Sequence, residues 1–408
     1  MGTSNGAVSI WTTAAARAGP IRWLATASST FATGTNCWPT TLRRPRSSRR
    51  WFRTVVPIKY LGSKRQFVPL IADIVERLRP AGTVLDLFSG TSRVGDALKR
   101  RQYRVLANDY LACAEVIARC YVEADGTSEQ LRQARLLIEE FNRLPPAPGY
   151  FTEVFCEKSR YVQPKNGARV DAIREEIERK DLDPELRAIV LVSLMEAADR
   201  VDSTTGVQMA YLKKWAPRAF NDLELRLPEI APRAGAGKGR AHRMDAAEAV
   251  DALEADVAYL DPPYNQHSFL GNYHVWESLV LWDKPEHYGV ACKRVDCKQR
   301  KSELNSKRNF HVAWERIVER VRARHLVVSF SDEGFIGRHE MEAILARRGE
   351  VQVIENDYRR YVGARIGVFN PSGEKVGRVS HLRNKEYLYV VSAEKLREAA
   401  VRAVAKAG

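Results

Sequence analysis

The stretch TVLDLFSGT at residues 83–91 decides the fold class of this chain. Its first six residues form a largely apolar run of the length of a buried strand, and Ser89, Gly90 and Thr91 form a turn of small residues. The spacing of apolar residues predicts further elements around this stretch: helices over 66–79, 93–101 and 113–123, and a strand over 104–107. Strand, turn, helix, strand and helix in this order predict a doubly wound, parallel α/β sheet.

The pattern changes in the middle of the chain. From about 127 to 227 long amphipathic helices are predicted, notably over 169–179 and 184–200, with no strand of comparable strength. The stretch 228–241 contains two prolines and three glycines and is predicted to be a mobile loop. Strand patterns then resume at 257–260, 325–330, 351–355 and 386–391. We therefore expect one sheet domain formed by 55–126 and 239–400, and an insert with its loop at 127–238.

The charge of the chain is positive and unevenly placed. Lys and Arg total 65 against 50 Asp and Glu, which gives a net charge of +15. This sign suits a polyanionic partner. Eight of the arginines lie in the first 58 residues and no acidic residue precedes Asp73, so more than half of the surplus belongs to the N-terminal stretch. The rest of the chain is only moderately basic.

Residues 1–54 are rich in Ala, Ser, Thr and Arg and show no sustained apolar period, so we expect a disordered basic extension. An upstream translated extension, with the natural start near Val55 or Val56, is the preferred interpretation. A transit peptide and a basic arm that binds phosphates are the alternatives.

Cysteine spacing and hydropathy exclude other classes. No apolar run approaches the roughly 18 residues that span a bilayer. Six cysteines are scattered without a C-x-x-C pair, as in a cytoplasmic protein with reduced thiols. Cys292 and Cys297, with His287 nearby, have poor spacing for zinc, so no metal site is predicted.

Two carboxylates belong to the first two predicted strands. Asp86 precedes the small-residue turn, and Asp109 ends the second strand about 20 residues later. In a nucleoside-binding sheet the turn lets the backbone approach the ligand, while the second carboxylate accepts both ribose hydroxyls. A tight connection without a ligand is the alternative.

The tetrad Asp261-Pro262-Pro263-Tyr264 follows the strand predicted over 257–260. Its two prolines fix the backbone and remove two N–H donors, so a carbonyl and a carboxylate can both accept from one amino group. An aromatic ring follows that is suited to stacking. This arrangement is typical of a site that holds the exocyclic NH2 of a base pulled out of its helix. A proline-capped strand end is the alternative.

Three motifs in this order resemble the D12-class (Dam-like, alpha-group) DNA adenine methyltransferases: KYLGSKR at 59–65, DLFSGT at 86–91 and DPPY at 261–264. The similarity covers roughly residues 57–392. It implies a Rossmann-like methyltransferase sheet, a helical target-recognition insert and S-adenosylmethionine as the cofactor. The implied activity is methylation of N6 of a flipped-out adenine in duplex DNA, for restriction-modification or epigenetic marking.

The resemblance also implies roles for individual residues. Asp261, Pro262, Pro263 and Tyr264 are the implied catalytic residues. The implied cofactor contacts are Lys59, Tyr60, Gly62, Lys64, Asp86, Phe88, Ser89, Gly90, Asp109 and Asp245. Lys64 is expected near the methionine carboxylate, Asp109 at the ribose and Asp245 near the cofactor adenine. The family often has a second glycine where this chain has Ser92, so close backbone approach is less assured there.

Contacts with DNA are expected on both sides of the catalytic loop. The predicted contact residues are Thr204, Thr205, Lys213, Lys214, Lys293, Arg294 and Lys307. They combine hydroxyls and cations that suit phosphate and groove contacts, and a solvated basic helix end is the alternative for the first group. The expected partners are double-stranded DNA and, functionally, a restriction endonuclease. We expect a monomer in a bacterial cytoplasm, with no membrane contact.

Other functions stay open at this point. The same fold can methylate RNA adenine or guanine, or a protein glutamine amide, and a catalytically silent DNA-binding module is a rival of a different class. An amide-directed enzyme would more often carry Asn at position 261, and an RNA enzyme would seldom need so large an insert. The intact tetrad argues against a silent module.

Overall fold

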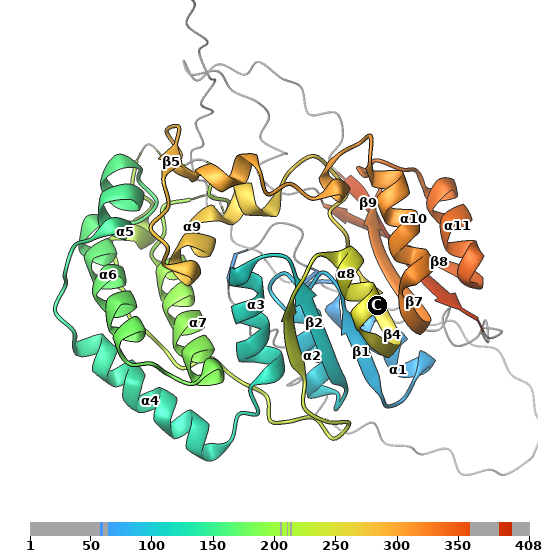
Figure 1. Cartoon of the computed structure of the whole chain (residues 1–408), viewed down its shortest axis with the longest axis horizontal. Helices are drawn as coiled ribbons and strands as arrows, with labels where there is room; N and C mark the ends of the chain where they lie inside the picture. The colour runs from blue at the N-terminus through green and yellow to red at the C-terminus, as the bar shows by residue number, and fades with distance from the viewer. Residues whose placement is uncertain are drawn as a thin grey trace, which may run out of the picture.

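The computed structural model describes residues 58–59, 64–204, 206–209, 211–212, 214–359 and 383–393. Seven strands of this part form one sheet in the order β3-β2-β1-β4-β7-β9-β8 (Figure 1). Their bounds are β1 Thr83–Asp86, β2 Arg104–Asp109, β3 Arg240–Arg243, β4 Glu254–Leu260, β7 Arg322–Ser331, β8 Glu350–Arg359 and β9 Arg383–Ser392. Neighbouring strands run parallel except at β9, which is antiparallel to β7 and β8. The predicted α/β class, a Rossmann-like sheet, is confirmed.

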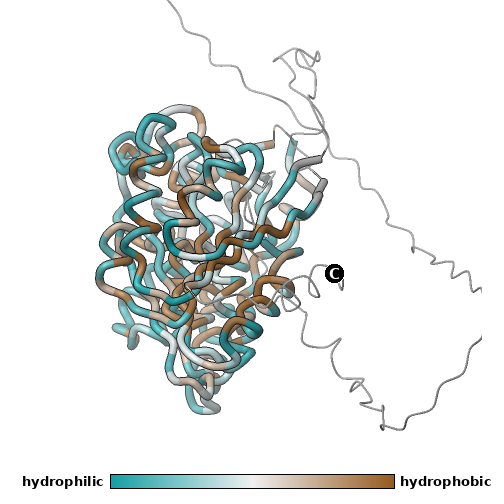
Figure 2. The backbone as a smooth tube through the Cα atoms, turned by 90° about the vertical axis from the view of Figure 1, so that its right-hand side faces the viewer, coloured by the Kyte–Doolittle hydropathy of each residue, from teal (hydrophilic) through white to brown (hydrophobic). Residues whose placement is uncertain are grey.

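Helices cover both faces of this sheet because successive strand residues point to opposite sides. In β1, Val84 packs on one face and Leu85 on the other. The Val84 face is covered by α1 (Val68–Leu78) and α2 (Arg93–Arg100). The Leu85 face is covered by three other helices: α8 (Ala246–Ala252), α10 (Phe310–Arg320) and α11 (Arg338–Leu345). Apolar segments run through the interior and polar ones lie at the periphery (Figure 2).

A separate group of helices packs beside the sheet (Figure 1). It contains α3 (Ala112–Ala118) with its π-helical continuation Arg119–Glu123, α4 (Ser128–Arg143), α5 (Tyr150–Thr152), α6 (Pro164–Arg179), α7 (Pro184–Arg200) and α9 (Phe269–Leu281). Helix α9 comes from far beyond the others in sequence. Its carboxyl end is held by the buried Arg174 of α6, which donates to the carbonyls of Leu279 (2.7 Å) and Val280 (3.2 Å). The segment that follows the DPPY tetrad is therefore fixed to the helical group.

The proline- and glycine-rich stretch 228–241 is not the mobile loop that its composition predicts. The Arg233 amide donates to the Asp125 carbonyl (3.1 Å), and the Ala236 amide donates to the Gln102 carbonyl (3.1 Å). Its last residues begin β3, which pairs with β2. The Glu123 carboxylate accepts from the Ala241 amide (3.1 Å). This prediction is wrong because the partners that hold the stretch lie about a hundred residues away.

None of the described helices is long and apolar enough to cross a membrane.

Ser92 has the backbone conformation of the glycine that the family often carries there. Its φ of 55° and ψ of 26° place it in the left-handed region, just before α2. The side chain is fully buried, and within the described residues its hydroxyl oxygen has no hydrogen-bond partner. The chain therefore follows a glycine-like turn with a serine, at a cost in backbone strain.

We expect Ser92→Gly to stabilise the protein. The left-handed conformation costs a residue with a Cβ roughly 1–2 kcal/mol. The greater freedom of glycine in the unfolded chain offsets roughly 0.5–1 kcal/mol of this. The free energy of unfolding, measured by urea denaturation, should rise by about 0.5–1 kcal/mol. Ser92→Ala removes the hydroxyl but keeps the Cβ, and an equal gain in that variant would contradict the backbone explanation.

Candidate active site

The candidate site lies where β1, β2 and β4 end, at the point where the strand order reverses between β1 and β4. Ligands of open α/β sheets bind in this position. A pocket opens there whose walls include Phe88, Asp109, Asp245, Asp261, Tyr264 and Arg300. A smaller pocket adjoins it, lined by Asp86, Ser89, Thr91 and Arg93 among others. Lys64, Phe88, Gly90 and Asp261 line both, so the two pockets form one continuous site.

Most of the residues predicted from the sequence meet in this site. The larger pocket contains Lys64, Phe88, Gly90, Asp109, Asp245, Asp261, Pro262, Pro263 and Tyr264, and the smaller one adds Asp86 and Ser89. Tyr60, Gly62, Thr205 and Lys213 lie outside the described residues. The three sequence motifs thus converge although they are separated by long stretches of chain.

The DPPY tetrad presents its groups at the end of β4. The Asp261 side chain is one-fifth exposed and faces the Lys64 ammonium at 3.1 Å. The Tyr264 ring packs edge-on against Phe330, with 6.0 Å between ring centroids. The Tyr264 carbonyl accepts from the Phe335 amide at 3.1 Å. The tetrad is therefore a supported loop that aims one carboxylate and one aromatic ring into the pocket.

Lys64 lies between two carboxylates. Its ammonium contacts Glu386 of β9 at 2.6 Å as well as Asp261, and the Ser329 hydroxyl of β7 donates to the same Glu386 oxygen (2.7 Å). Burial alone would lower the pKa of Lys64, but the two carboxylates raise it well above its usual value. Lys64 is therefore a permanent cation, and its expected contact with the cofactor carboxylate competes with two partners already in place.

The charge state of Asp261 follows from the same contacts. The pKa of Asp261 is raised to about 6, chiefly by burial and also by the charge of Glu386, while Lys64 acts in the opposite sense. Asp261 is therefore mainly ionised at neutral pH and close to titration. Glu386 was not singled out from the sequence, because a glutamate at the start of a predicted strand carries no local signal of a site.

Asp86 is a buried carboxylate without a counter-charge. It is 1% exposed, and neither oxygen has a hydrogen-bond partner of normal geometry in the described residues. Burial, followed by the charges of Asp261 and Asp109, raises the pKa of Asp86 to about 8, and only the Gly95 amide acts in the opposite sense. Buried carboxylates are normally paired. The smaller pocket is thus prepared for a cationic ligand group.

Asp109 is held by the turn after β1. Its two oxygens accept from the amides of Gly90 (2.9 Å) and Leu111 (3.0 Å), and burial raises the pKa of Asp109 to about 6. Asn108, which sequence reasoning missed, donates its amide to the carbonyls of Leu87 and Met244, each at 3.2 Å. Met244 precedes Asp245, which begins α8 and accepts from the Ala247 amide (2.9 Å). Asn108 therefore positions three strand ends around the pocket.

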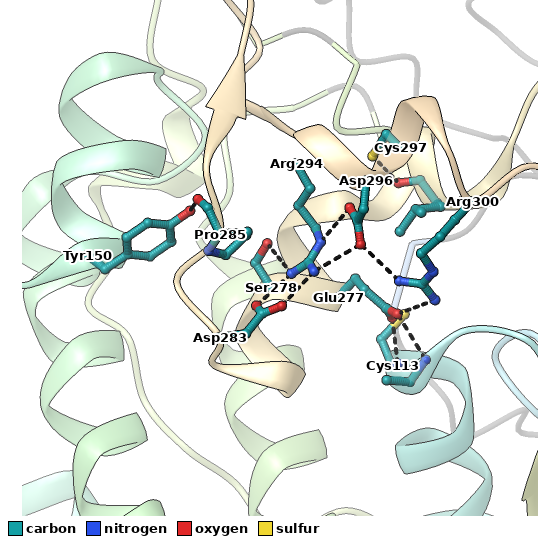
Figure 3. A network of polar contacts seen from close by, with 12 residues as sticks. Cys113, Tyr150, Glu277, Ser278, Asp283, Pro285, Arg294, Asp296, Cys297 and Arg300 are labelled. Atoms are coloured by element: carbon teal, nitrogen blue, oxygen red, sulfur yellow. Dashed lines mark hydrogen bonds and ion pairs between the residues drawn. The ribbon is translucent and has the colours of Figure 1, made fainter.

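Two predicted contacts have structural roles instead. Arg294 is 4% exposed and forks onto both oxygens of Asp283, each at 2.7 Å, and onto Asp296 at 3.0 Å (Figure 3). Because the Arg294 guanidinium donates to carboxylates inside the protein, the prediction that it contacts DNA is not supported. Thr204 is buried and its hydroxyl donates to Asp202. Its predicted DNA contact is not supported for the same reason.

Lys59 does not line either pocket. Its ammonium binds Asp202 at 2.7 Å and the Asp199 carbonyl at 2.7 Å, at the end of α7. The expectation that it contacts the cofactor is not supported. Lys214 and Lys307 are exposed and Lys293 is half-buried, so these three stay predictions for DNA contact. Arg300, Lys301 and Ser302, from the basic stretch after the tetrad, line the larger pocket.

A glycine turn after β1, a carboxylate at the end of β2 and a DPPY tetrad after β4 surround one pocket, and together they define an amino-methyltransferase type of site. The family model of the D12 class N6 adenine-specific DNA methyltransferases matches residues 60–343. The chain belongs to this family. The predicted family is thereby confirmed.

Three curated relatives illustrate the likeness. The type II methyltransferase M.FokI of Planomicrobium okeanokoites is 31% identical over 327 residues, which cover 74% of this chain and 50% of that protein. The modification methylase StsI of Streptococcus sanguinis is 29% identical, with 74% and 49% covered. The type II methyltransferase M.NlaIII of Neisseria lactamica is 27% identical, with 76% and 90% covered. The chain spans about half the length of M.FokI and StsI.

We expect Lys64→Met to destabilise the protein by about 3–5 kcal/mol near pH 8, because it leaves two buried carboxylates unpaired. Without Lys64 the pKa of folded Asp261 rises further above its unfolded value. A carboxyl whose pKa is higher in the folded state than in the unfolded state lowers the free energy of unfolding as pH rises. The loss of unfolding free energy relative to wild type should therefore be smaller at pH 5 than at pH 8. Urea denaturation at both pH values measures it. Lys165→Met, which removes a surface pair with Asp222, serves as the control. Equal deficits at the two pH values would contradict the assignment.

Proposed function

We propose that this protein transfers a methyl group from S-adenosylmethionine to N6 of a flipped-out adenine in duplex DNA. The observation that carries the proposal is the Asp261 carboxylate, which lies at the junction of the two pockets, beside the cation Lys64. The cofactor would extend across this junction from the smaller pocket into the larger one, so Asp261 and the other tetrad residues would hold the base beside it. Family membership and the type II methyltransferase relatives support the same activity.

The residues of the site fit the cofactor. Asp86, buried and without a counter-charge, would pair with the ammonium of the methionine moiety. Arg93 lines the same pocket and would meet the carboxylate, since Lys64 is already bound by Asp261 and Glu386. Asp109 would accept from the ribose hydroxyls, and Phe88 and Asp245 would frame the adenine. When bound, the cofactor supplies an electrophilic methyl group on its sulfonium.

The tetrad would hold and activate the amine. The Asp261 carboxylate and the Pro262 carbonyl accept from the two N6–H bonds, which favours the pyramidal nitrogen needed for attack. The same oxygens stabilise the positive charge that develops on nitrogen. With a pKa of about 6, Asp261 can also take up the proton that N6 loses. Tyr264 would stack on the base, a contact worth roughly 1–3 kcal/mol in comparable sites.

The target-recognition role is proposed for the helical insert at 127–238, together with exposed cations such as Lys214 and Lys307. A cognate restriction endonuclease as a functional partner is proposed from the type II relatives. The rival substrate is RNA adenine or guanine, which the same pocket chemistry could accept.

Incubation with S-adenosylmethionine labelled in its methyl group should label unmethylated duplex DNA and neither RNA nor protein. Asp261→Ala should abolish transfer, by at least a thousandfold, while cofactor affinity stays within about threefold, because the carboxylate acts on the amine. Glu254→Ala, an exposed carboxylate at the amino end of β4 that pairs with Arg322, is the control and should retain full activity. Label in RNA alone, or full activity in Asp261→Ala, would refute the proposal.

The rate of transfer should fall with an acid limb near pH 6, because protonated Asp261 no longer accepts from N6–H. Glu386→Gln removes a negative charge that raises the pKa of Asp261. We therefore expect its acid limb at lower pH, with a reduced rate at the plateau. Single-turnover rates from pH 5 to 8.5 measure this. Glu355→Gln, on the exposed side of neighbouring β8, is the control. A limb that stays in place in Glu386→Gln would show that Glu386 does not set the charge state of Asp261.

A further inference from the structure

Residues 300–305, here called the strap, connect the cofactor side of the pocket with the catalytic loop. Arg300, Lys301, Ser302 and Asn305 line the larger pocket together with the DPPY tetrad. The strap follows the hairpin of β5 (His287–Tyr288) and β6 (Lys293–Arg294). Its two ends make different contacts, and neither end has a role in the proposed chemistry so far.

The first end of the strap is fixed to the wall of the cofactor pocket. The Arg300 guanidinium lies over the ring of Tyr110, 5.1 Å from its centroid. Tyr110 lines the pocket directly after Asp109, the residue proposed for the ribose. A cation over an aromatic face restrains both groups. Arg300 therefore restrains the Tyr110 ring at the wall of the pocket.

A buried carboxylate holds Arg300 in this position (Figure 3). Glu277 of α9 is fully buried and accepts from Arg300 at 3.1 Å. It also accepts from the amides of Ala112 (3.2 Å) and Cys113 (3.0 Å), at the first turn of α3. The other terminal nitrogen of the Arg300 guanidinium, Nη1, donates to the Asp296 carboxylate at 3.3 Å. One side chain thus joins α9, the start of α3 and the strap.

The second end of the strap is fixed to the loop that holds the base. The Asn305 side-chain amide donates to the carbonyls of Asn265 (2.8 Å) and His267 (3.3 Å). Asn265 directly follows Tyr264 of the tetrad. Leu304, 3% exposed, packs in the core under the sheet face, so this end cannot swing freely.

We propose that Arg300 and Asn305 are positioning residues, and that the strap between them couples cofactor binding to the arrangement of the base-holding loop. A cofactor that restrains Tyr110 and Arg300 also restrains Asn305 and Asn265 through the strap. A bound base that restrains Asn265 restrains Arg300 and Tyr110 in the same way. The coupling is reciprocal, so DNA tightens cofactor binding by the same factor by which the cofactor tightens DNA binding. The inference rests on the proposed function.

The test measures the affinity for S-adenosylhomocysteine, the unreactive demethylated cofactor, with and without unmethylated plasmid DNA. For wild type we expect DNA to tighten this binding roughly tenfold. Arg300→Ala should weaken binding about tenfold without DNA, since it releases Tyr110. Asn305→Ala should bind normally without DNA, lose the tightening by DNA, and turn over about tenfold more slowly at saturating cofactor. Arg322→Ala is the matched control, because Arg322 is an exposed arginine at the amino end of β7 that pairs with Glu254, and this variant should behave as wild type.

A merely structural role would lower cofactor affinity and turnover together in both variants, and that result would overturn the inference. Retention of the full tightening in Asn305→Ala, or normal cofactor affinity in Arg300→Ala, would overturn it as well. The Arg300 measurement needs no DNA. Loss of affinity there supports the strap even if wild type were to methylate no DNA, which would refute the proposed function alone.

Discussion

The site depends on one buried cation between two carboxylates. Lys64 comes from the segment before α1, Asp261 from the loop after β4, and Glu386 from β9, so a single ammonium joins three distant parts of the chain. Buried charges are stable only when paired, and these contacts therefore fix the position of the catalytic loop. Asp86, in the adjoining pocket, has no such partner among the residues that the structure describes. The charges around Lys64 are therefore balanced within the protein, whereas the carboxylate of Asp86 is suited to a cationic ligand group.

The centre of the sheet could be predicted because its strands are apolar runs with a turn behind them, as in the stretch 83–91. Strand β3 could not be predicted, because the sequence of Arg240–Arg243 has no apolar pattern. This strand is held by its pairing with β2 and by the hydrogen bond from the Ala241 amide to Glu123. The insertion of β9 between β7 and β8 is likewise a property of long-range pairing. Local patterns describe elements, whereas strand order depends on contacts across the chain.

The same distinction applies to the site. Asp86, Asp109 and Asp261 were predictable because each lies at or directly after the carboxyl end of a strand, and parallel strands bring these ends together. Glu386 and Asn108 gave no such signal, since their roles depend on what faces them. Arg294 was assigned to DNA because the composition of a basic stretch does not reveal its counter-ions. Lys59 was assigned to the cofactor by its place in the KYLGSKR motif, which does not reveal its counter-ion either. Lys59 binds Asp202, 143 residues away, and the fold alone brings them together.

The place of β9 has a consequence for the order in which the protein is made. β9 is the last of the described strands in sequence, yet it lies inside the sheet, between β7 and β8. A nascent chain on the ribosome that ends before residue 383 leaves the edges of β7 and β8 unpaired and Lys64 without Glu386. Such open edges are prone to wrong pairing. The sheet and the ion pairs of Lys64 are therefore completed at the same time, when β9, the last of the described strands, has been synthesised.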